Sequence, residues 1–156
     1  MSKVLLIIDL QKQFEDTAGN YRRIVNKIED LIPNYDKVYA TVFSQGKKSN
    51  FKKKLGWNGC QNCTGNDLDF SIRLNDEIII KDTYGIKDLP MYLRDADEVT
   101  VVGCEADSSI LAVCFQLWDL GYNFKVLSDY IFSNHNLYST DTIKLILNKN
   151  FGDCVV

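Results

Sequence analysis

Three short apolar runs of the chain end close to a polar side chain that can do chemistry. Asp9, Lys81 and Ser109 lie at or just beyond the ends of these runs. The runs are Val4–Ile8, Ile78–Ile80 and Val99–Val102. A carboxylate can move a proton, a cation can stabilise negative charge, and a third group can attack or hold a substrate. The alternative is a salt bridge that pins two strand ends, plus a serine at a helix start, and spacing alone slightly favours it.

The segment around Ser109 is typical of a buried strand that turns sharply into a helix. Two β-branched residues lead into Gly103, a polar turn follows, and a helical apolar pattern begins after Ser109. The first backbone N–H groups of a helix have no partner inside it, and the dipole there is positive. Such a place favours an anion or an activated nucleophile. The simpler interpretation is that Asp107 or Ser108 caps the helix.

Unbroken apolar runs alternate with helical periodicity along most of the chain. Unbroken runs of four to eight residues are typical of strands buried on both faces, as in a parallel sheet. The pattern predicts an α/β fold: one doubly wound, Rossmann-like domain over residues 1–156, with a mainly parallel sheet of about six strands and helices on both faces. The expected strands are Val4–Ile8, Val38–Phe43, Ile78–Ile80, Val99–Val102, Phe124–Leu127 and Cys154–Val156. Segments near 24–32, 88–95, 109–120 and 140–147 are expected to be helical, and residues 44–75 irregular.

In such folds ligands bind outside the carboxyl ends of the strands. Asp9, Lys81 and Ser109 all fall at such ends, so we expect them to share one pocket if their strands are neighbours. A carboxylate or an ammonium at the end of a buried strand is costly unless it is paired or solvated. Asp9 and Lys81 are therefore expected to pair.

Composition excludes several classes of function. With 156 residues and a net charge of −3, the chain has no global field that attracts nucleic acid or an acidic membrane. A cluster of lysines at 47–54 is interpreted as a solvated loop. No run is long enough to span a bilayer and no signal peptide is apparent, so we expect a cytoplasmic protein without nucleic-acid or membrane partners.

The five cysteines are an odd number and widely spread, which suits reduced thiols. Cys60 and Cys63 have the spacing of a metal or redox pair. A structural zinc site needs four ligands, and the chain offers no second close pair and a single histidine, His135. We therefore interpret the pair as loop cysteines and keep a redox protein as a distant alternative. His135 is assigned no catalytic role and can hold the last loop through a hydrogen bond.

Four segments in order resemble the isochorismatase-like hydrolase superfamily, also called the cysteine hydrolase family, which includes nicotinamidases, N-carbamoylsarcosine amidases and isochorismatases. Leu5–Phe14 resembles its opening strand and DxQxxF turn, and Ile79–Tyr84 its lysine segment. Val101–Ala112 resembles its VVGxxTDxCVLA segment, and Asp119–Asp129 the DLGY segment that follows. The resemblance spans nearly the whole chain.

The resemblance implies a role for each matching residue. Asp9 would be the catalytic acid and base, Lys81 the cation beside it, and position 109 the site of the nucleophile. The backbone N–H groups of Glu105 and Ser109 would form the oxyanion hole. It also implies a cis peptide bond between Cys104 and Glu105, at least a homodimer, and a small-molecule substrate.

Residue 109 departs from the family, because the family places cysteine there and this chain has serine. A thiol near a helix N-terminus and a lysine can be held as thiolate, whereas a hydroxyl normally needs a strong base beside it. Three interpretations remain open. The serine was engineered to silence the enzyme or trap a substrate; it serves vinyl-ether hydrolysis of the isochorismatase type, which needs Asp9 and no nucleophile; or the protein binds without catalysis.

Two further expectations concern the metal content of the pocket and the residues that form its walls. Metal-binding members carry an Asp-x-His and a further His after the second strand, and residues 41–51 here hold no histidine. We therefore expect no metal and no cofactor. The substrate pocket is expected to be lined by Gln11, behind Asp9, and by the aromatic residues Phe14, Trp57 and Tyr84. Ordinary aromatic packing is about as consistent with the positions of the three aromatic residues. The leading hypothesis is amide hydrolysis.

Overall fold

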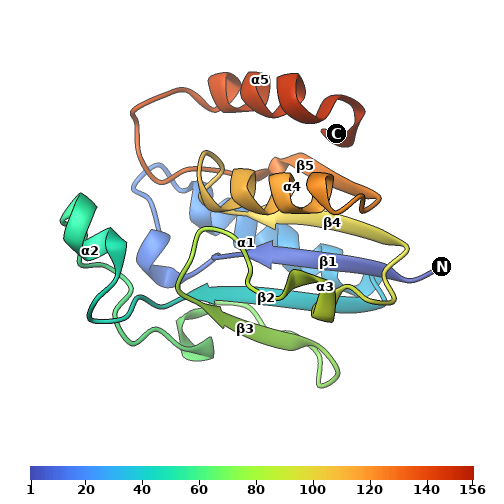
Figure 1. Cartoon of the computed structure of the whole chain (residues 1–156), viewed down its shortest axis with the longest axis horizontal. Helices are drawn as coiled ribbons and strands as arrows, with labels where there is room; N and C mark the ends of the chain where they lie inside the picture. The colour runs from blue at the N-terminus through green and yellow to red at the C-terminus, as the bar shows by residue number, and fades with distance from the viewer.

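The computed structural model describes all residues, 1–156, and contains a five-stranded parallel sheet in the order β3-β2-β1-β4-β5 (Figure 1). Its strands are β1 (Lys3–Ile8), β2 (Lys37–Phe43), β3 (Glu77–Lys81), β4 (Glu98–Gly103) and β5 (Phe124–Ile131). The α-helices are α1 (Asn20–Leu31), α2 (Asn50–Leu55), α3 (Leu89–Tyr92), α4 (Ser109–Asp119) and α5 (Thr140–Phe151). Short 3-10 turns span Lys12–Phe14, Ile32–Asn34, Gly65–Asp67 and Gly152–Cys154. The predicted doubly wound parallel sheet is confirmed.

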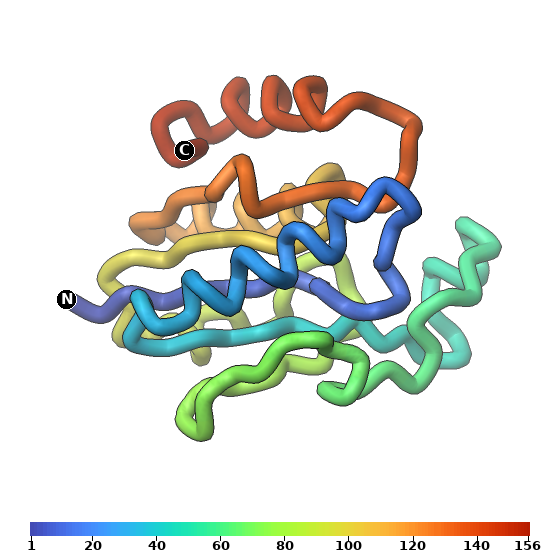
Figure 2. Tube along the Cα trace, turned by 180° about the vertical axis from the view of Figure 1, so that it is seen from behind, coloured from blue at the N-terminus to red at the C-terminus, as the bar shows by residue number.

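Each face of the sheet has its own apolar core. Helix α1 buries Ile24, Val25 and Ile28 against one face, and Figure 2 shows this helix lying along the sheet. Helix α4 buries Ile110, Val113 and Leu117 against the other. Helices α3 and α5 lie on the side of α4 (Figure 1). Strands β1 and β4 are almost fully buried, because they lie in the interior of the sheet.

Two expectations differ from the structure in detail. The last residues add no full strand: Val155 forms a single parallel bridge with Val126 of β5. The segment 44–75 is not wholly irregular, because Asn50–Leu55 forms the short helix α2. The hydroxyl of Ser49 accepts the Lys52 N–H at its start, and Gly56 ends it at φ +66°. This helix buries none of its residues, so it leaves no apolar periodicity in the sequence.

None of the helices is long and apolar enough to cross a membrane.

Candidate active site

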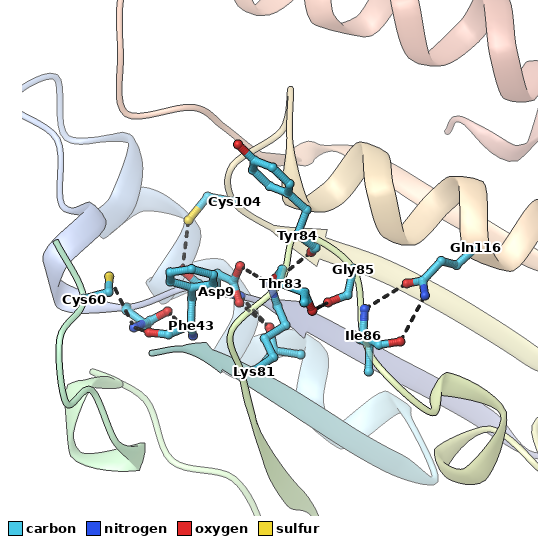
Figure 3. A network of polar contacts seen from close by, with 12 residues as sticks. Asp9, Phe43, Cys60, Lys81, Thr83, Tyr84, Gly85, Ile86, Cys104 and Gln116 are labelled. Atoms are coloured by element: carbon cyan, nitrogen blue, oxygen red, sulfur yellow. Dashed lines mark hydrogen bonds and ion pairs between the residues drawn. The ribbon is translucent and has the colours of Figure 1, made fainter. Parts of the chain in front are cut away.

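The sheet order places Asp9 and Lys81 on either side of β2. Asp9 directly follows β1, Lys81 is the last residue of β3, and both strands pair with β2. The Lys81 Nζ lies 2.7 Å from Asp9 Oδ2, and the two side chains are only 3% and 2% exposed. Figure 3 shows the two side chains meeting at the carboxyl ends of the strands. The expected pair therefore forms, although the two strands are not direct neighbours.

Thr41 of β2 lies between the two strands and fixes Asp9. Its hydroxyl donates to Asp9 Oδ1 at 2.6 Å and accepts the Asp9 backbone N–H at 2.9 Å. Asp9 itself has the uncommon φ of +45°. The sequence reasoning missed Thr41, and the available signal was a polar residue inside an otherwise apolar strand. With Thr41 on one oxygen and Lys81 on the other, the carboxylate has a single well-defined position.

All three ammonium hydrogens of Lys81 have protein acceptors. Besides Asp9, the Nζ donates to the backbone carbonyls of Thr83 at 2.7 Å and Tyr84 at 3.0 Å. The ring of Phe43 lies 5.3 Å from the Nζ, a cation–π distance. An ammonium has three donors and no acceptor. Lys81 is therefore built to supply a fixed positive charge rather than to hand a proton to a ligand.

Ser109 is the first residue of α4 and is 6% exposed. The peptide bond between Cys104 and Glu105 is cis, as the resemblance implied. Gly103, at φ +117°, lets the end of β4 approach β1, because a Cβ there would lie 2.2 Å from the Ile8 carbonyl oxygen. The backbone N–H groups of Glu105 and Ser109 donate to no protein acceptor. They are available to a ligand, as an oxyanion hole requires.

Asp9 and Ser109 line the same cleft, which has a volume of about 600 Å³, whereas Lys81, expected in the same pocket, does not line it. Phe14, Trp57 and Tyr84 line it as expected. Three further aromatic residues that were not predicted also line the cleft: Phe43, Phe51 and Tyr138. The rings of Phe43 and Phe51 pack together with centroids 4.8 Å apart.

Gln11 does not line this cleft, which corrects the expectation that it borders the substrate pocket. The side chain is fully buried. Its amide accepts the Phe43 N–H at 2.7 Å and donates to the Phe43 carbonyl at 3.0 Å. Gln11 therefore ties the loop after β1 to the end of β2, behind the Asp9–Lys81 pair.

The side of the cleft formed after β4 and β5 carries two carboxylates and an imidazole. Glu105, Asp107 and His135 place one ligand atom each within 4.8 Å of one another. The His135 Nε2 lies 2.9 Å from Asp107 Oδ2, so this histidine helps to hold the loop between β5 and α5 in place. Glu105 accepts the Asn134 N–H, and burial raises the pKa of its carboxyl to about 7. Only the spatial approach of the two loops identifies this group.

Ser109, His135 and Asp107 do not form a catalytic triad. The Leu137 N–H donates to His135 Nδ1 at 3.2 Å, so in this arrangement Nε2 carries the proton and donates to Asp107. Neither ring nitrogen is left to accept a proton from Ser109. The same tautomer leaves no free ring lone pair for a metal ion. The loop after β2 does not fit one either, because Gln45 uses its amide on the carbonyls of Trp57 and Gly59 and no histidine lies there.

Cys60 and Cys63 are free thiols in a loop, and both are buried. Burial raises the pKa of each thiol, which lowers the fraction of reactive thiolate. The two thiols lie beside each other, but their raised pKa values disfavour the reactive thiolate that the redox alternative needs.

Comparisons with known proteins agree with this architecture. The family model described as Isochorismatase domain matches residues 3–153. Among solved structures, a nicotinamidase from Bacillus subtilis is 19% identical with a TM-score of 0.82, covering 100% of this chain and 99% of its own. The N-carbamoylsarcosine amidase from Thermoplasma acidophilum is 17% identical with a TM-score of 0.83, covering 99% and 95%.

A third similar structure is the pyrazinamidase of Pyrococcus horikoshii in complex with zinc. It is 18% identical with a TM-score of 0.80, covering 100% of this chain and 99% of its own. No curated protein matches the sequence. At these identities the structural likeness establishes the fold.

Proposed function

Because the chain belongs to the Isochorismatase domain family of hydrolases, we propose that it hydrolyses the carbon–nitrogen bond of a small amide in the cleft beside Asp9. The observation that carries this proposal is the buried Asp9–Lys81 pair, 2.7 Å apart, whose carboxylate opens onto the cleft that Ser109 also lines. Burying two charges is costly, and a simple structural bridge at a strand end needs neither a cleft nor free N–H donors.

The proposed reaction proceeds through an ester on Ser109. The Ser109 hydroxyl attacks the amide carbonyl while Asp9 accepts its proton. The N–H groups of Glu105 and Ser109 receive the negative charge that develops on the carbonyl oxygen. Asp9 then gives the proton to the departing amine, and the carbon–nitrogen bond breaks. Water, deprotonated by Asp9, cleaves the ester, and the proton returns to Ser109.

In these reaction steps, Lys81 acts through its positive charge. Its ammonium stays bonded to Asp9 and to two carbonyls, so it holds the carboxylate in place and keeps a fixed positive charge beside the reacting groups. This role requires the positive charge and its position, and no proton transfer from the lysine.

A second candidate, vinyl-ether hydrolysis with Asp9 as the acid, is favoured by the surroundings of Ser109. The hydrogen bonds of Asp9 go to Thr41 and Lys81, and those of His135 go to Asp107 and Leu137, so no base is bonded to the Ser109 hydroxyl. A hydroxyl without a base is a weak nucleophile. Protonation of an enol ether by Asp9 followed by attack of water needs no nucleophile at position 109.

A panel of small amides and an isochorismate-like vinyl ether tests both candidates. Ammonia release and pyruvate release are measured for the protein with Ser109 and for its Ser109→Cys and Asp9→Asn variants. Amide hydrolysis predicts ammonia release that rises in Ser109→Cys and disappears in Asp9→Asn. Pyruvate release that is indifferent to Ser109→Cys supports the second candidate. If no variant turns over any compound but the natural protein binds one unchanged, a binding protein without catalysis replaces both.

The proposal also covers the setting in which the protein works. The substrate is a small molecule, no metal or other cofactor takes part, and neither nucleic acid nor membrane is a partner. We expect a cytoplasmic homodimer or larger homo-oligomer, and size-exclusion chromatography with light scattering tests the assembly.

A further inference from the structure

Gln116 joins the helix that begins at Ser109 to the loop that follows Lys81. It lies on α4, and its side-chain amide makes two hydrogen bonds with the backbone of Ile86. The Oε1 accepts the Ile86 N–H at 2.8 Å, and the Nε2 donates to the Ile86 carbonyl at 3.0 Å. Figure 3 shows this paired contact on one side of the view and the Asp9–Lys81 pair on the other.

The loop that Gln116 holds is the same loop that holds Lys81. The carbonyls of Thr83 and Tyr84 accept two of the three ammonium hydrogens. The Thr83 hydroxyl in turn donates to the carbonyl of Gly85 at 2.8 Å, the residue before Ile86. The backbone from Thr83 to Ile86 is therefore bound at one end by the Lys81 ammonium and at the other end by the Gln116 amide.

The fit between Gln116 and this loop is close. A Cβ added at Gly85 would lie 2.5 Å from the Gln116 Oε1, nearer than a real Cβ approaches another atom. Ile86 is 1% exposed, so its backbone groups cannot turn to water when the amide is lost. Of the side-chain hydrogen bonds in the structure, only these two connect residues 82–88 with α4.

We propose that Gln116 is a positioning residue, whose two hydrogen bonds to Ile86 set where the Lys81 ammonium stands relative to the start of α4. The inference rests on the proposed function, in which this charge acts on Asp9 and on the group at position 109. Gln116 touches neither Asp9 nor Lys81, and it acts only through the loop. Misplacement of a catalytic group by about 1 Å can cost about 100-fold in rate, so such a residue matters to catalysis.

The thiol in the Ser109→Cys variant offers a reporter that needs no substrate. Its thiolate displaces iodide from iodoacetamide, and the pH dependence of that rate gives the pH at which the thiol ionises. A nearby ammonium favours the thiolate and lowers this midpoint. Labelling is assigned to position 109 by fragmentation mass spectrometry, because five other cysteines are present and Cys104 and Cys114 lie within five residues of it. Lys81→Ala in this background measures the full effect of the charge.

Gln116→Met in the same background removes both hydrogen bonds while keeping a side chain of similar length. We expect the alkylation midpoint to move upward by about one pH unit, in the direction of the Lys81→Ala variant. Gly85→Ala disturbs the contact from the loop side and should move the midpoint in the same direction. Asn150→Ala is the matched control, because Asn150 is also a helix amide but bonds only within α5, to the Ile146 carbonyl. It should leave the midpoint unchanged.

The outcomes separate the inference from the proposed function. A midpoint that shifts in Lys81→Ala but not in Gln116→Met or Gly85→Ala overturns the role of Gln116 and leaves the proposed function intact. A midpoint that is unmoved even by Lys81→Ala overturns both the electrostatic role of Lys81 and the inference built on it. Circular dichroism accompanies each variant. If Gln116→Met does not fold, Gly85→Ala decides the question.

Discussion

The Lys81 ammonium reaches the Asp9 carboxylate across the carboxyl end of β2, because this strand separates β1 from β3 in the sheet. Thr41 of β2 lies between these two strands, and its hydroxyl donates to the other carboxylate oxygen, Asp9 Oδ1. Three strands therefore converge on one carboxylate. This arrangement holds the charge in place before any ligand arrives, which is the condition for electrostatic catalysis.

Removing one partner of the pair should destabilise the fold more than removing both. Lys81→Met leaves the Asp9 charge buried without its cation, which we expect to cost about 3–5 kcal/mol. The double variant Asp9→Asn/Lys81→Met buries no charge and should recover part of that loss. Urea unfolding of the two single variants and the double variant gives the coupling free energy. Strictly additive effects would contradict a direct interaction between the two side chains.

Thr41→Val should lower both stability and turnover. The valine leaves the Asp9 N–H without its acceptor and the Asp9 Oδ1 without its donor, a loss of about 1–3 kcal/mol. Because the carboxylate loses a fixed position, turnover should fall by about tenfold or more. Thr41→Ser keeps the hydroxyl and should restore most of both. Urea unfolding and steady-state rates measure the two effects.

Thr100→Val provides the matched control for Thr41→Val. Thr100 is equally buried, in β4, but its hydroxyl has no hydrogen-bond partner in the structure. The same substitution there removes an unsatisfied polar atom, so stability should stay equal or rise by up to about 1 kcal/mol. A similar loss of stability in both variants would mean that the shape of the valine side chain causes the loss. The Thr41 hydrogen bonds would then make no measurable contribution to the free energy of unfolding.

Glu105 should make the stability of the protein fall as pH rises from about 4.5 to about 7. Burial raises the pKa of this carboxyl from its ordinary 4.5 to about 7, so between these values the folded state binds the proton and the unfolded state does not. The stabilisation is complete below the lower value and lost above the higher one. Glu105→Gln removes this titration.

The measurement for Glu105 is urea unfolding of both proteins at pH 5 and pH 8. Relative to the natural protein, Glu105→Gln should be more stable at pH 8 than at pH 5, and the difference should be constant above about pH 8. Equal differences at the two pH values would show that the Glu105 carboxyl ionises alike in both states.

Chelation should leave the protein unaffected. The His135 tautomer and the lack of histidine in the loop after β2 leave zinc without imidazole ligands at this cleft. Dialysis against EDTA is therefore expected to change neither the melting temperature nor the turnover, and added zinc or manganese should not raise the melting temperature. A melting temperature that rises with metal concentration would show that Glu105, Asp107 or other groups bind it after rearrangement.

The alternation of strands and helices and the places of Asp9, Lys81 and Ser109 at strand ends could be predicted from the sequence. These are local properties, because an unbroken apolar run indicates a buried parallel strand and the residue after it must stand at the sheet edge. The motif resemblance added the expected roles. A short helix without a buried face, α2, lacked such a local signal and was missed.

Which polar groups form hydrogen bonds with one another could be learned only from the folded chain. Thr41 and Thr100 look alike in sequence, each a threonine inside an apolar strand, yet one bonds Asp9 and the other has no partner. The Gln11 side chain bonds the backbone of Phe43 instead of lining the cleft. Gln116 and Ile86, which are distant in the sequence, form hydrogen bonds with each other. Such contacts depend on strand order and on how loops close over the sheet edge. A hydrogen bond requires partners within about 3 Å, and no pattern along one segment fixes that distance to another.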